Sequence, residues 1–515
     1  MKSIVLVSAF LAVLVWMKPS GLVYAHGFGE RYDLPIPLDY YFWGSAAAIL
    51  LSFAVIGAFV KAMPEQVPYW RWNLLGAKWA AWLFSSNSFK YIIQAISVLS
   101  MLLVIATGMW GNQNPGMNLA PTFVWIIWWV GLVFAIAAIG NFWLLVNPWS
   151  ILFEGVEYCY DYFKPGRRLW LGYDYPRSLS VWPSLGFFIC FAWFENVSPG
   201  ASLPAVISVM VIAYSIITWV GMAFFGREVW LCYGEVFSVI FGFFARLAPT
   251  ELRVTNTSYC GNCLVECNPQ GTGCINCYPC WSMADTENRQ LNIRPFAVGL
   301  IEPTSESSSR LALVVAVLAT VTFDGFMETP IWFDIKGDLW GQIHMVFEDN
   351  TSLVIDSVGL LFAPVMFIGL FMYFSLLMRW TSGTQTGAIR LMAVFAYSLL
   401  PIALAYHVAH FFTLLVIQGQ LIIPLASDPF GYGWNLFGTS GYRVNIGLID
   451  AKFAWFLGVS AIVLGHIVAV YIAHMIALRV FENRQQAIRS QYPMLGLMVL
   501  YTVVSLWIIA QPMVE

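Results

Sequence analysis

Residues 259–281 read YCGNCLVECNPQGTGCINCYPCW, and this Cys-rich segment holds six of the nine cysteines in the chain. The six are Cys260, Cys263, Cys267, Cys274, Cys277 and Cys280. Glycine, asparagine and proline stand between them, which favours a loop folded around thiolate ligands over a helix or a strand. The segment therefore predicts a metal or iron–sulfur centre, with a disulfide framework as the alternative.

Apolar stretches of membrane-spanning length lie on both sides of the Cys-rich segment. Hydrophobic residues make up 59% of the 515 positions and charged residues only 10%, which excludes an ordinary soluble domain. We expect about ten spans, at residues 40–60, 91–110, 121–145, 181–199, 203–225, 311–328, 353–378, 391–417, 452–478 and 492–511. The predicted fold is an all-α membrane protein in which the Cys-rich loop separates two five-helix halves.

The N-terminus predicts a secretory signal peptide. Lys2 precedes an apolar run, and the small-residue pattern Val23-Tyr24-Ala25 follows it, so cleavage is expected after Ala25. An uncleaved anchor is the alternative. Cleavage would expose the amine and imidazole of His26 as ligands for a copper-type ion, although His26 also fits as an ordinary residue after a cleavage site. The predicted parts are 1–25 (signal peptide), 26–225 (first transmembrane half), 226–310 (Cys-rich loop and linker) and 311–515 (second transmembrane half).

The distribution of basic residues predicts the orientation in the membrane. With the mature N-terminus outside, the outer segments receive only four of the 25 Lys and Arg residues, namely Arg31, Lys336, Arg443 and Lys452. Apart from two in the signal peptide, the others fall in inner loops, as the positive-inside rule requires. We therefore expect a multi-pass protein of a bacterial-type inner membrane with both mature termini outside. The Cys-rich loop is then cytoplasmic, where reduced thiols favour metal ligation over disulfides.

The cysteine spacing leaves two cofactors open. Cys274, Cys277 and Cys280 have the spacing of an iron–sulfur run, but Ala284 stands where its fourth cysteine belongs. Paired Cys-x2-Cys knuckles also suit a structural zinc ion, with Cys260 and Cys263 facing Cys274 and Cys277.

Four histidines in two predicted spans form a second candidate site. His407 and His410 share one helix face, while His466 and His474 lie in a later span. Counting about 1.5 Å per residue places His407 and His466 at similar depth. Ionisable groups in hydrocarbon are costly, so they indicate function unless they are hydrogen-bonded between packed helices. We expect His407, His410 and His466 to be catalytic and His474 to be a metal ligand, with acidic partners among Asp324, Glu195 and Asp356.

The histidine set suits two kinds of chemistry. Imidazoles with a carboxylate hold a divalent ion, most simply zinc, that turns bound water into a hydroxide nucleophile. Facing histidines also ligate haem, with the Cys-rich loop as a second redox centre. The acidic outer segments, which include His344, are a third place for a hydrolytic metal ion. The net charge of −3 is spread along the chain and predicts no nucleic-acid partner.

Several stretches resemble the polytopic membrane proteins called fenitrothion hydrolase. They are AHGFGERYDLPIP (residues 25–37), TVTFDGF (320–326), AYHVAHFF (405–412), DPFGYGWNLFG (428–438) and SQYPMLGLMVLYTVVSLWIIAQP (490–512). The resemblance implies hydrolysis of an organophosphorus triester with release of a nitrophenol-type leaving group. A small apolar substrate of this kind enters the bilayer. Because the Cys-rich loop has no part in such hydrolysis, a membrane redox or metal-handling protein is the alternative.

Overall fold

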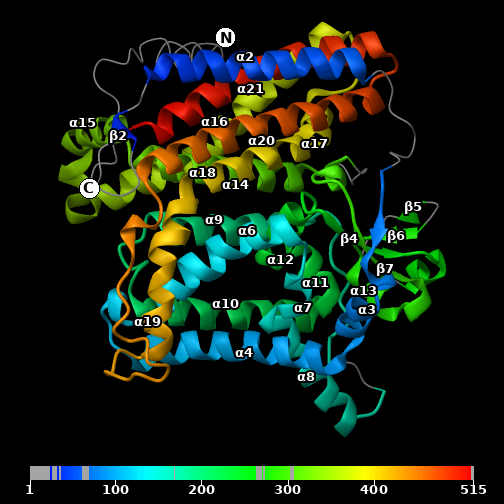
Figure 1. Ribbon diagram of the computed structural model, residues 1–515, viewed down its shortest axis with the longest axis vertical. Helices are drawn as coiled ribbons and strands as arrows, with labels where there is room; N and C mark the ends of the chain where they lie inside the picture. The colour runs from blue at the N-terminus through cyan, green and yellow to red at the C-terminus, as the bar shows by residue number, and fades with distance from the viewer. Residues whose placement is uncertain are drawn as a thin grey trace. The chain divides into compact units, whose positions relative to one another are not determined.

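The structure is a computed structural model that describes residues 24–25, 32–33, 36–60, 69–166, 169–262, 269–270, 273–301 and 307–511. Nearly all of the predicted signal peptide, together with His26, Cys263 and Cys267, lies outside these residues. The chain is mostly helical and divides into two compact units (Figure 1). Unit 1 comprises residues 1–63, 314–413 and 446–515, and unit 2 comprises residues 64–313 and 414–445.

The described residues contain nine helical stretches that are long and apolar enough to cross a membrane. They are α2 (Leu38–Phe59), α4 (Asn87–Trp110), Leu119–Ile139, α10 (Pro204–Phe225), α14 (Ser308–Met327), Pro330–Ser382, Ala388–Ser427, α20 (Ala451–Val480) and α21 (Arg484–Ile509). Each coincides with one of the ten predicted spans. The chain is therefore an all-α membrane protein, and its apolar helices suit contact with lipid.

Three of the nine stretches are composite. Leu119–Ile139 joins α5 (Leu119–Pro121), the π-helical η3 (Thr122–Val130) and α6 (Gly131–Ile139). Pro330–Ser382 joins α15 (Pro330–Phe347), η7 (Glu348–Asn350) and α16 (Thr351–Ser382). Ala388–Ser427 joins α17 (Ala388–Phe395), η8 (Ala396–Leu399), α18 (Leu400–Ile417), η9 (Gln418–Leu421) and α19 (Ile422–Ser427).

The tenth predicted span, at residues 181–199, forms a shorter helix. This helix, α9 (Trp182–Asn196), has 15 residues, or about 22 Å at 1.5 Å per residue, against about 30 Å of hydrocarbon. A further candidate span was missed because its ends carry arginines. It is the pair α11 (Arg227–Tyr233) and α12 (Val236–Ala245), bent by 65° at the break. Glu235 lies in the break, is fully buried, and caps α12 by accepting hydrogen bonds from two backbone amides.

In unit 1, α2 packs with α20 and α21 although it comes first in the chain (Figure 1). The compact units thus do not follow the division into halves before and after the Cys-rich segment. α16 also packs along α21. α18 and α20 approach closely at Gly465, where an added Cβ would lie 2.4 Å from Cβ of Ala405. Small residues permit such contact between membrane helices, since bulky side chains would hold the backbones apart.

Unit 2 pairs α4 with α10, which run side by side in Figure 1. Here an added Cβ at Gly108 would lie 1.9 Å from Oγ of Ser208, so the contact requires glycine. Aromatic rings fill the interior next to α12. Trp128 lies edge-on to Phe237 with ring centroids 4.5 Å apart, and Trp143 packs against Phe241 at 5.3 Å. Such pairs add to the free energy that burial supplies.

Unit 2 also carries a small antiparallel sheet with the strand order β3-β7-β4-β6-β5. The strands are β3 (Trp72–Asn73), β4 (Thr250–Val254), β5 (Pro269–Gln270), β6 (Gly273–Ile275) and β7 (Arg289–Ile293). A further pair, β1 (Tyr24–Ala25) and β2 (Tyr32–Asp33), lies near the N-terminus. The expectation that the Cys-rich segment lacks helix and strand is wrong for two cysteines. Cys274 lies in β6 and Cys280 in α13 (Tyr278–Met283), because pairing with β4 overrides the weak local preference.

The sheet is held at its centre by the buried carboxylate of Glu251. Glu251 in β4 lies opposite Asn292 in β7. Its Oε2 accepts a hydrogen bond from Tyr69 at 2.7 Å and lies 3.3 Å from Nη1 of Arg294, while Oε1 accepts one from Nε of Arg71 at 2.7 Å. Both Glu251 and Arg294 are fully buried as side chains. A buried carboxylate is tolerated only with such partners, so these contacts join β3, β4 and β7 into one polar core.

Candidate functional site

Three cysteines of the Cys-rich segment come together in the structure. The Sγ atoms of Cys260, Cys274 and Cys280 all lie within 4.8 Å of one another. Cys274 and Cys280 are buried, and Cys260 in η4 (Thr257–Asn262) is half-buried. Across the described part of the chain, this is the one group of three or more Cys, His, Asp or Glu side chains close enough to share an ion.

The local fold explains why these three cysteines meet. Val254 at the end of β4 pairs with Cys274 in β6, and Cys280 packs against both. Ala284, which the spacing argument found in place of a fourth cysteine, fills the same small core. Since each cysteine comes from a different element, the cluster forms only when the segment is folded onto β4.

Contacts around the cluster hold its outer shell in place. Tyr259 donates a hydrogen bond to Oδ2 of Asp285 at 2.6 Å, which links the start of the segment to its end. Arg289 donates from Nε to the carbonyl of Ala284 at 2.6 Å, and its guanidinium lies 5.1 Å from the ring centroid of Trp281. These contacts tie both ends of the Cys-rich segment to the strand that follows it.

The sulfur spacing can be compared with the geometry of a single metal ion. A tetrahedral zinc ion with Zn–S bonds of about 2.3 Å places its sulfur ligands about 3.8 Å apart. The limit of 4.8 Å among the three sulfurs fits a single ion. Cys277 packs against the same core but lies outside the group of three. The predicted facing pair of Cys-x2-Cys knuckles also needs Cys263, which lies outside the described residues.

The histidines lie in unit 1, and the structure gives each a separate environment. Nε2 of His410 lies 2.9 Å from Oδ2 of Asp324, and both side chains are partly exposed. His407 is buried one turn earlier, with its ring 4.9 Å from that of Phe411. Although the two share a helix and His466 lies on the neighbouring one, these histidines form no three-ligand group within the described residues.

His466 and His474 on α20 are both buried. Nδ1 of His466 donates to the carbonyl of Ile462 at 2.8 Å, while its Nε2 finds no hydrogen-bond partner in the described structure. His474 contacts two oxygens, Oε1 of Gln491 from Nδ1 and the carbonyl of Val60 from Nε2, both at 2.9 Å. Both nitrogens of His474 thus face acceptors that join α20 to α21 and α2.

The other acidic candidates lie elsewhere. Asp356 accepts hydrogen bonds from Nζ of Lys336 at 2.6 Å and from Nε1 of Trp332 at 3.1 Å. Glu195 belongs to α9 in unit 2, whereas the histidines belong to unit 1. In α15, the ring of His344 stacks on Trp340 with centroids 4.7 Å apart.

Sequence reasoning missed three groups beside the histidines. The buried ring of Tyr406 lies 6.1 Å from that of His410 between centroids, and the ring of Tyr501 lies 5.8 Å from that of His466. Glu328 follows Asp324 by four residues, just after the end of α14. Tyr406 had a local signal, because it stands four residues before His410 on the same helix face. Glu328 and Tyr501 had no such signal in the sequence, since their proximity to the histidines depends on how α14, α18 and α21 pack.

Comparisons of this chain with family models, with curated proteins and with solved structures found no match.

Proposed function

We propose that this protein is an integral membrane metalloprotein that binds a single thiophilic metal ion through Cys260, Cys274 and Cys280. The observation that carries the proposal is the mutual approach of the three sulfurs within 4.8 Å in a folded, mostly buried setting. In the unfolded chain the three cysteines are separated from one another. Folding brings their sulfurs to the spacing of ligands around one ion. Binding of an ion by these thiolates would add its binding free energy to the stability of the folded segment.

Zinc is the ion that this site suits best. Zinc takes four ligands in structural sites, so a fourth ligand completes the set that the three thiolates begin. Elemental analysis of the purified protein should find zinc, and the absorption spectrum should show no visible band. A visible iron–sulfur spectrum would contradict the single-ion assignment and restore the cluster that the cysteine spacing also allowed.

The proposal places the Cys-rich segment in the cytoplasm of a cell with a bacterial-type inner membrane, and both mature termini outside. The bias of Lys and Arg toward the inner loops supports this orientation. A reporter fused after Arg289 is expected to behave as cytoplasmic and one fused at Glu515 as periplasmic. The opposite pattern would make disulfide formation the favoured explanation for the cysteines.

The second candidate function is hydrolysis of organophosphorus triesters, which the pairing of His410 with Asp324 favours. With Nε2–H of His410 donating to the carboxylate, Nδ1 is left with a lone pair that removes a proton from water. Asp324 stabilises the resulting imidazolium, and the hydroxide attacks phosphorus as the phenolate leaves. The side chains of the pair are 16% and 21% exposed, and this chemistry needs no shared metal ion.

Changing His410 to Gln should lower triester hydrolysis by about 10²- to 10⁴-fold per inserted molecule, because the general base is lost. The assay is release of the nitrophenol-type product from a phosphorothioate by protein in lipid vesicles. His344→Gln, which changes an exposed histidine of the outer segment, is the matched control. Equal activity in the His410 variant and the control would reject this candidate.

A further inference from the structure

An exposed group of tryptophans occupies the segment that runs from β3 toward α4 in unit 2. Four of the 24 tryptophans in the chain fall within residues 70–82. They are Trp70, Trp72, Trp79 and Trp82, and each is between 60% and 72% exposed. We call these four residues the Trp surface. Indole rings carry a large apolar area, so four exposed rings in so short a segment indicate a surface that binds something.

Contacts inside the sheet explain why the first two indoles face outward. Tyr69 and Arg71 both reach the carboxylate of Glu251 in the polar core of the sheet, at 2.7 Å each. Side chains along a strand point alternately to its two faces. Trp70 and Trp72 therefore lie on the face opposite the polar core, and the contacts of Glu251 fix them there.

The other two indoles belong to α3 (Lys78–Ser85). Trp79 and Trp82 are three residues apart and share one face of this helix, while Ala80 is fully buried. The next residue after α3 is Ser86, whose hydroxyl caps α4 by accepting a hydrogen bond from the amide of Phe89 at 3.3 Å. The Trp surface is thus joined to the sheet at one end and to a membrane-spanning helix at the other.

The length of α4 gives the depth of the Trp surface in a bilayer. α4 has 24 residues, or about 36 Å at 1.5 Å per residue, against about 30 Å of hydrocarbon. Its far end carries aromatic side chains as well, because Trp110 is 69% exposed and Tyr432 donates a hydrogen bond to the Trp110 carbonyl. Aromatic side chains gather at both membrane–water interfaces. With Trp110 at one interface, the Trp surface lies among the lipid headgroups of the other.

The charge of this region favours anionic headgroups. Residues 69–110 contain Arg71, Lys78 and Lys90 but no Asp or Glu. Arg71 is paired with Glu251. In contrast, Lys78 is exposed at the start of α3, and Lys90 is half-buried in the first turn of α4. A Lys or Arg held close to an anionic membrane surface strengthens binding about fivefold.

We propose that the Trp surface, together with Lys78 and Lys90, docks the small sheet on the headgroups of anionic phospholipids. The indole rings lie in the headgroup layer, and the two ammonium groups face lipid phosphates. β3 is an edge strand of the sheet whose strand β6 carries Cys274. Docking through β3 therefore keeps the sheet at the membrane surface and restrains one of its edges. The lipid contact does not depend on whether the cysteines hold a metal ion.

The test uses full-length protein that contains fluorotryptophan, in nanodiscs of phosphatidylcholine mixed with phosphatidylglycerol. The fluorine resonance of Trp82 is identified by its absence from the spectrum of Trp82→Phe. A spin label on the lipid headgroup should broaden this resonance, whereas a water-soluble gadolinium chelate should not. Broadening by the chelate and not by the lipid label would leave the Trp surface free for a protein partner and would overturn the proposal.

A titration of phosphatidylglycerol into phosphatidylcholine nanodiscs tests the role of charge. Lys78→Gln should raise, by about fivefold, the fraction of phosphatidylglycerol at which the Trp82 resonance completes half of its shift, because one positive charge is lost. Lys452→Gln, which changes an exposed lysine in the first turn of α20 in unit 1, is the matched control and should not alter this midpoint. An unchanged midpoint in Lys78→Gln would reject the recognition of anionic lipid.

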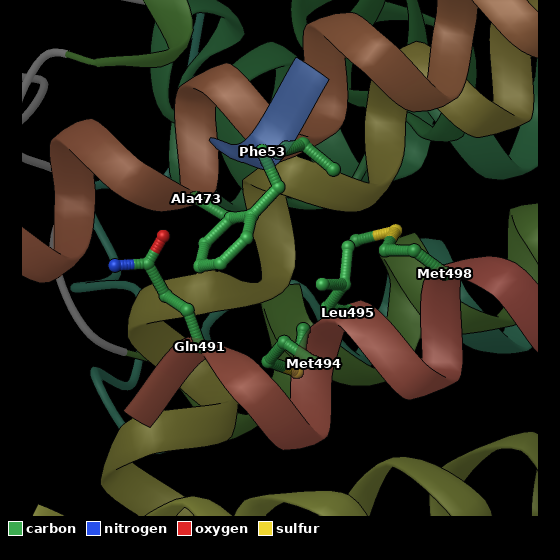
Figure 2. Close-up of a pocket in the computed structure, with 7 residues that line it drawn as sticks. Phe53, Ala473, Gln491, Met494, Leu495 and Met498 are labelled. Atoms are coloured by element: carbon green, nitrogen blue, oxygen red, sulfur yellow. The ribbon is translucent and has the colours of Figure 1, made fainter. Parts of the chain in front are cut away.

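Proteolysis tests whether lipid contact restrains the sheet. Phosphatidylglycerol should slow tryptic cleavage after Arg253 in β4 of the parent protein, and replacing Trp79 and Trp82 together with alanine should abolish this protection. Phe53→Ala is the matched control, since Phe53 lines a pocket between α2, α20 and α21 in unit 1 (Figure 2). This control should keep the protection. Full protection in the double variant would contradict docking through the Trp surface.

Zinc content distinguishes this proposal from the metal site. It should stay at the parent level in every variant of the Trp surface and of Lys78, because none of these residues belongs to the group of three cysteines. Loss of lipid docking with zinc retained would therefore leave the proposed function standing, and protein without zinc that still docks would leave the lipid surface standing.

Discussion

Replacing both Cys274 and Cys280 with serine is expected to remove the bound metal ion from the protein. Serine keeps the size of the side chain but is not a thiolate, and both positions belong to the group of three converging sulfurs. Structural zinc in small peptides binds with an apparent free energy of about 10–16 kcal/mol, so loss of two ligands also destabilises the local fold. Elemental analysis after dialysis measures the metal, and tryptic cleavage after Arg289 measures the local fold.

The matched control is Cys159→Ser together with Cys190→Ser, since both of these cysteines are exposed and lie on helices outside the Cys-rich segment. This control should retain the parent metal content. If the Cys274 and Cys280 variant kept its metal, the site would have to be assigned to other residues, and the proposed function would fail with it.

The second large effect is expected at Glu251. Glu251→Gln removes the carboxylate that faces Arg294 and Arg71 in the interior of the sheet. Breaking a buried ion pair leaves the guanidinium of Arg294 without its counter-charge, which costs about 3–5 kcal/mol. The sheet that supports the cysteine cluster should then open more often. The rate of tryptic cleavage after Arg253, inside β4, measures this opening.

A surface ion pair provides the control. Arg227 contacts Glu154 at 2.8 Å, and the Glu154 side chain is half exposed. Glu154→Gln should cost at most about 1 kcal/mol, because solvent screens the pair. If Glu251→Gln were cleaved no faster than Glu154→Gln, the buried carboxylate would not hold the sheet.

The same carboxylate predicts the acid sensitivity of the sheet. Burial by itself would raise the pKa of Glu251, but the hydrogen bond from Tyr69 and the charges of Arg294 and Arg71 outweigh burial and lower it below 4.5. A group with a lowered pKa in the folded state contributes its full stability above pH 4.5 and loses it as the pH falls through the lower value. The parent sheet should therefore lose protection from an acid-active protease in that range, whereas the already weakened Glu251→Gln sheet should change less.

The amino-acid sequence by itself determined the class of protein and the positions of nine candidate spans among the described residues. Long apolar runs such as 203–225 and 452–478 form helices in the structure because hydrocarbon requires every backbone group to be satisfied locally. The same reasoning failed at residues 227–245, where Arg227 and Arg246 flank an apolar pair that bends at Glu235. An apolar helix bends where the polar groups at the bend find hydrogen-bond partners, and these partners lie on other helices.

The tertiary structure alone decided which ionisable side chains meet. The spacing of the cysteines indicated ligation, but only the pairing of β6 with β4 selected Cys274 and Cys280 together with Cys260. The histidines were recognised from their place in apolar helices, yet the structure gave His410 a carboxylate, left Nε2 of His466 without a partner and joined His474 to Val60, more than 400 positions earlier. Sequence periodicity predicts which face of a helix a residue occupies. Which side chains lie opposite that face depends on the packing of helices that are far apart in the chain.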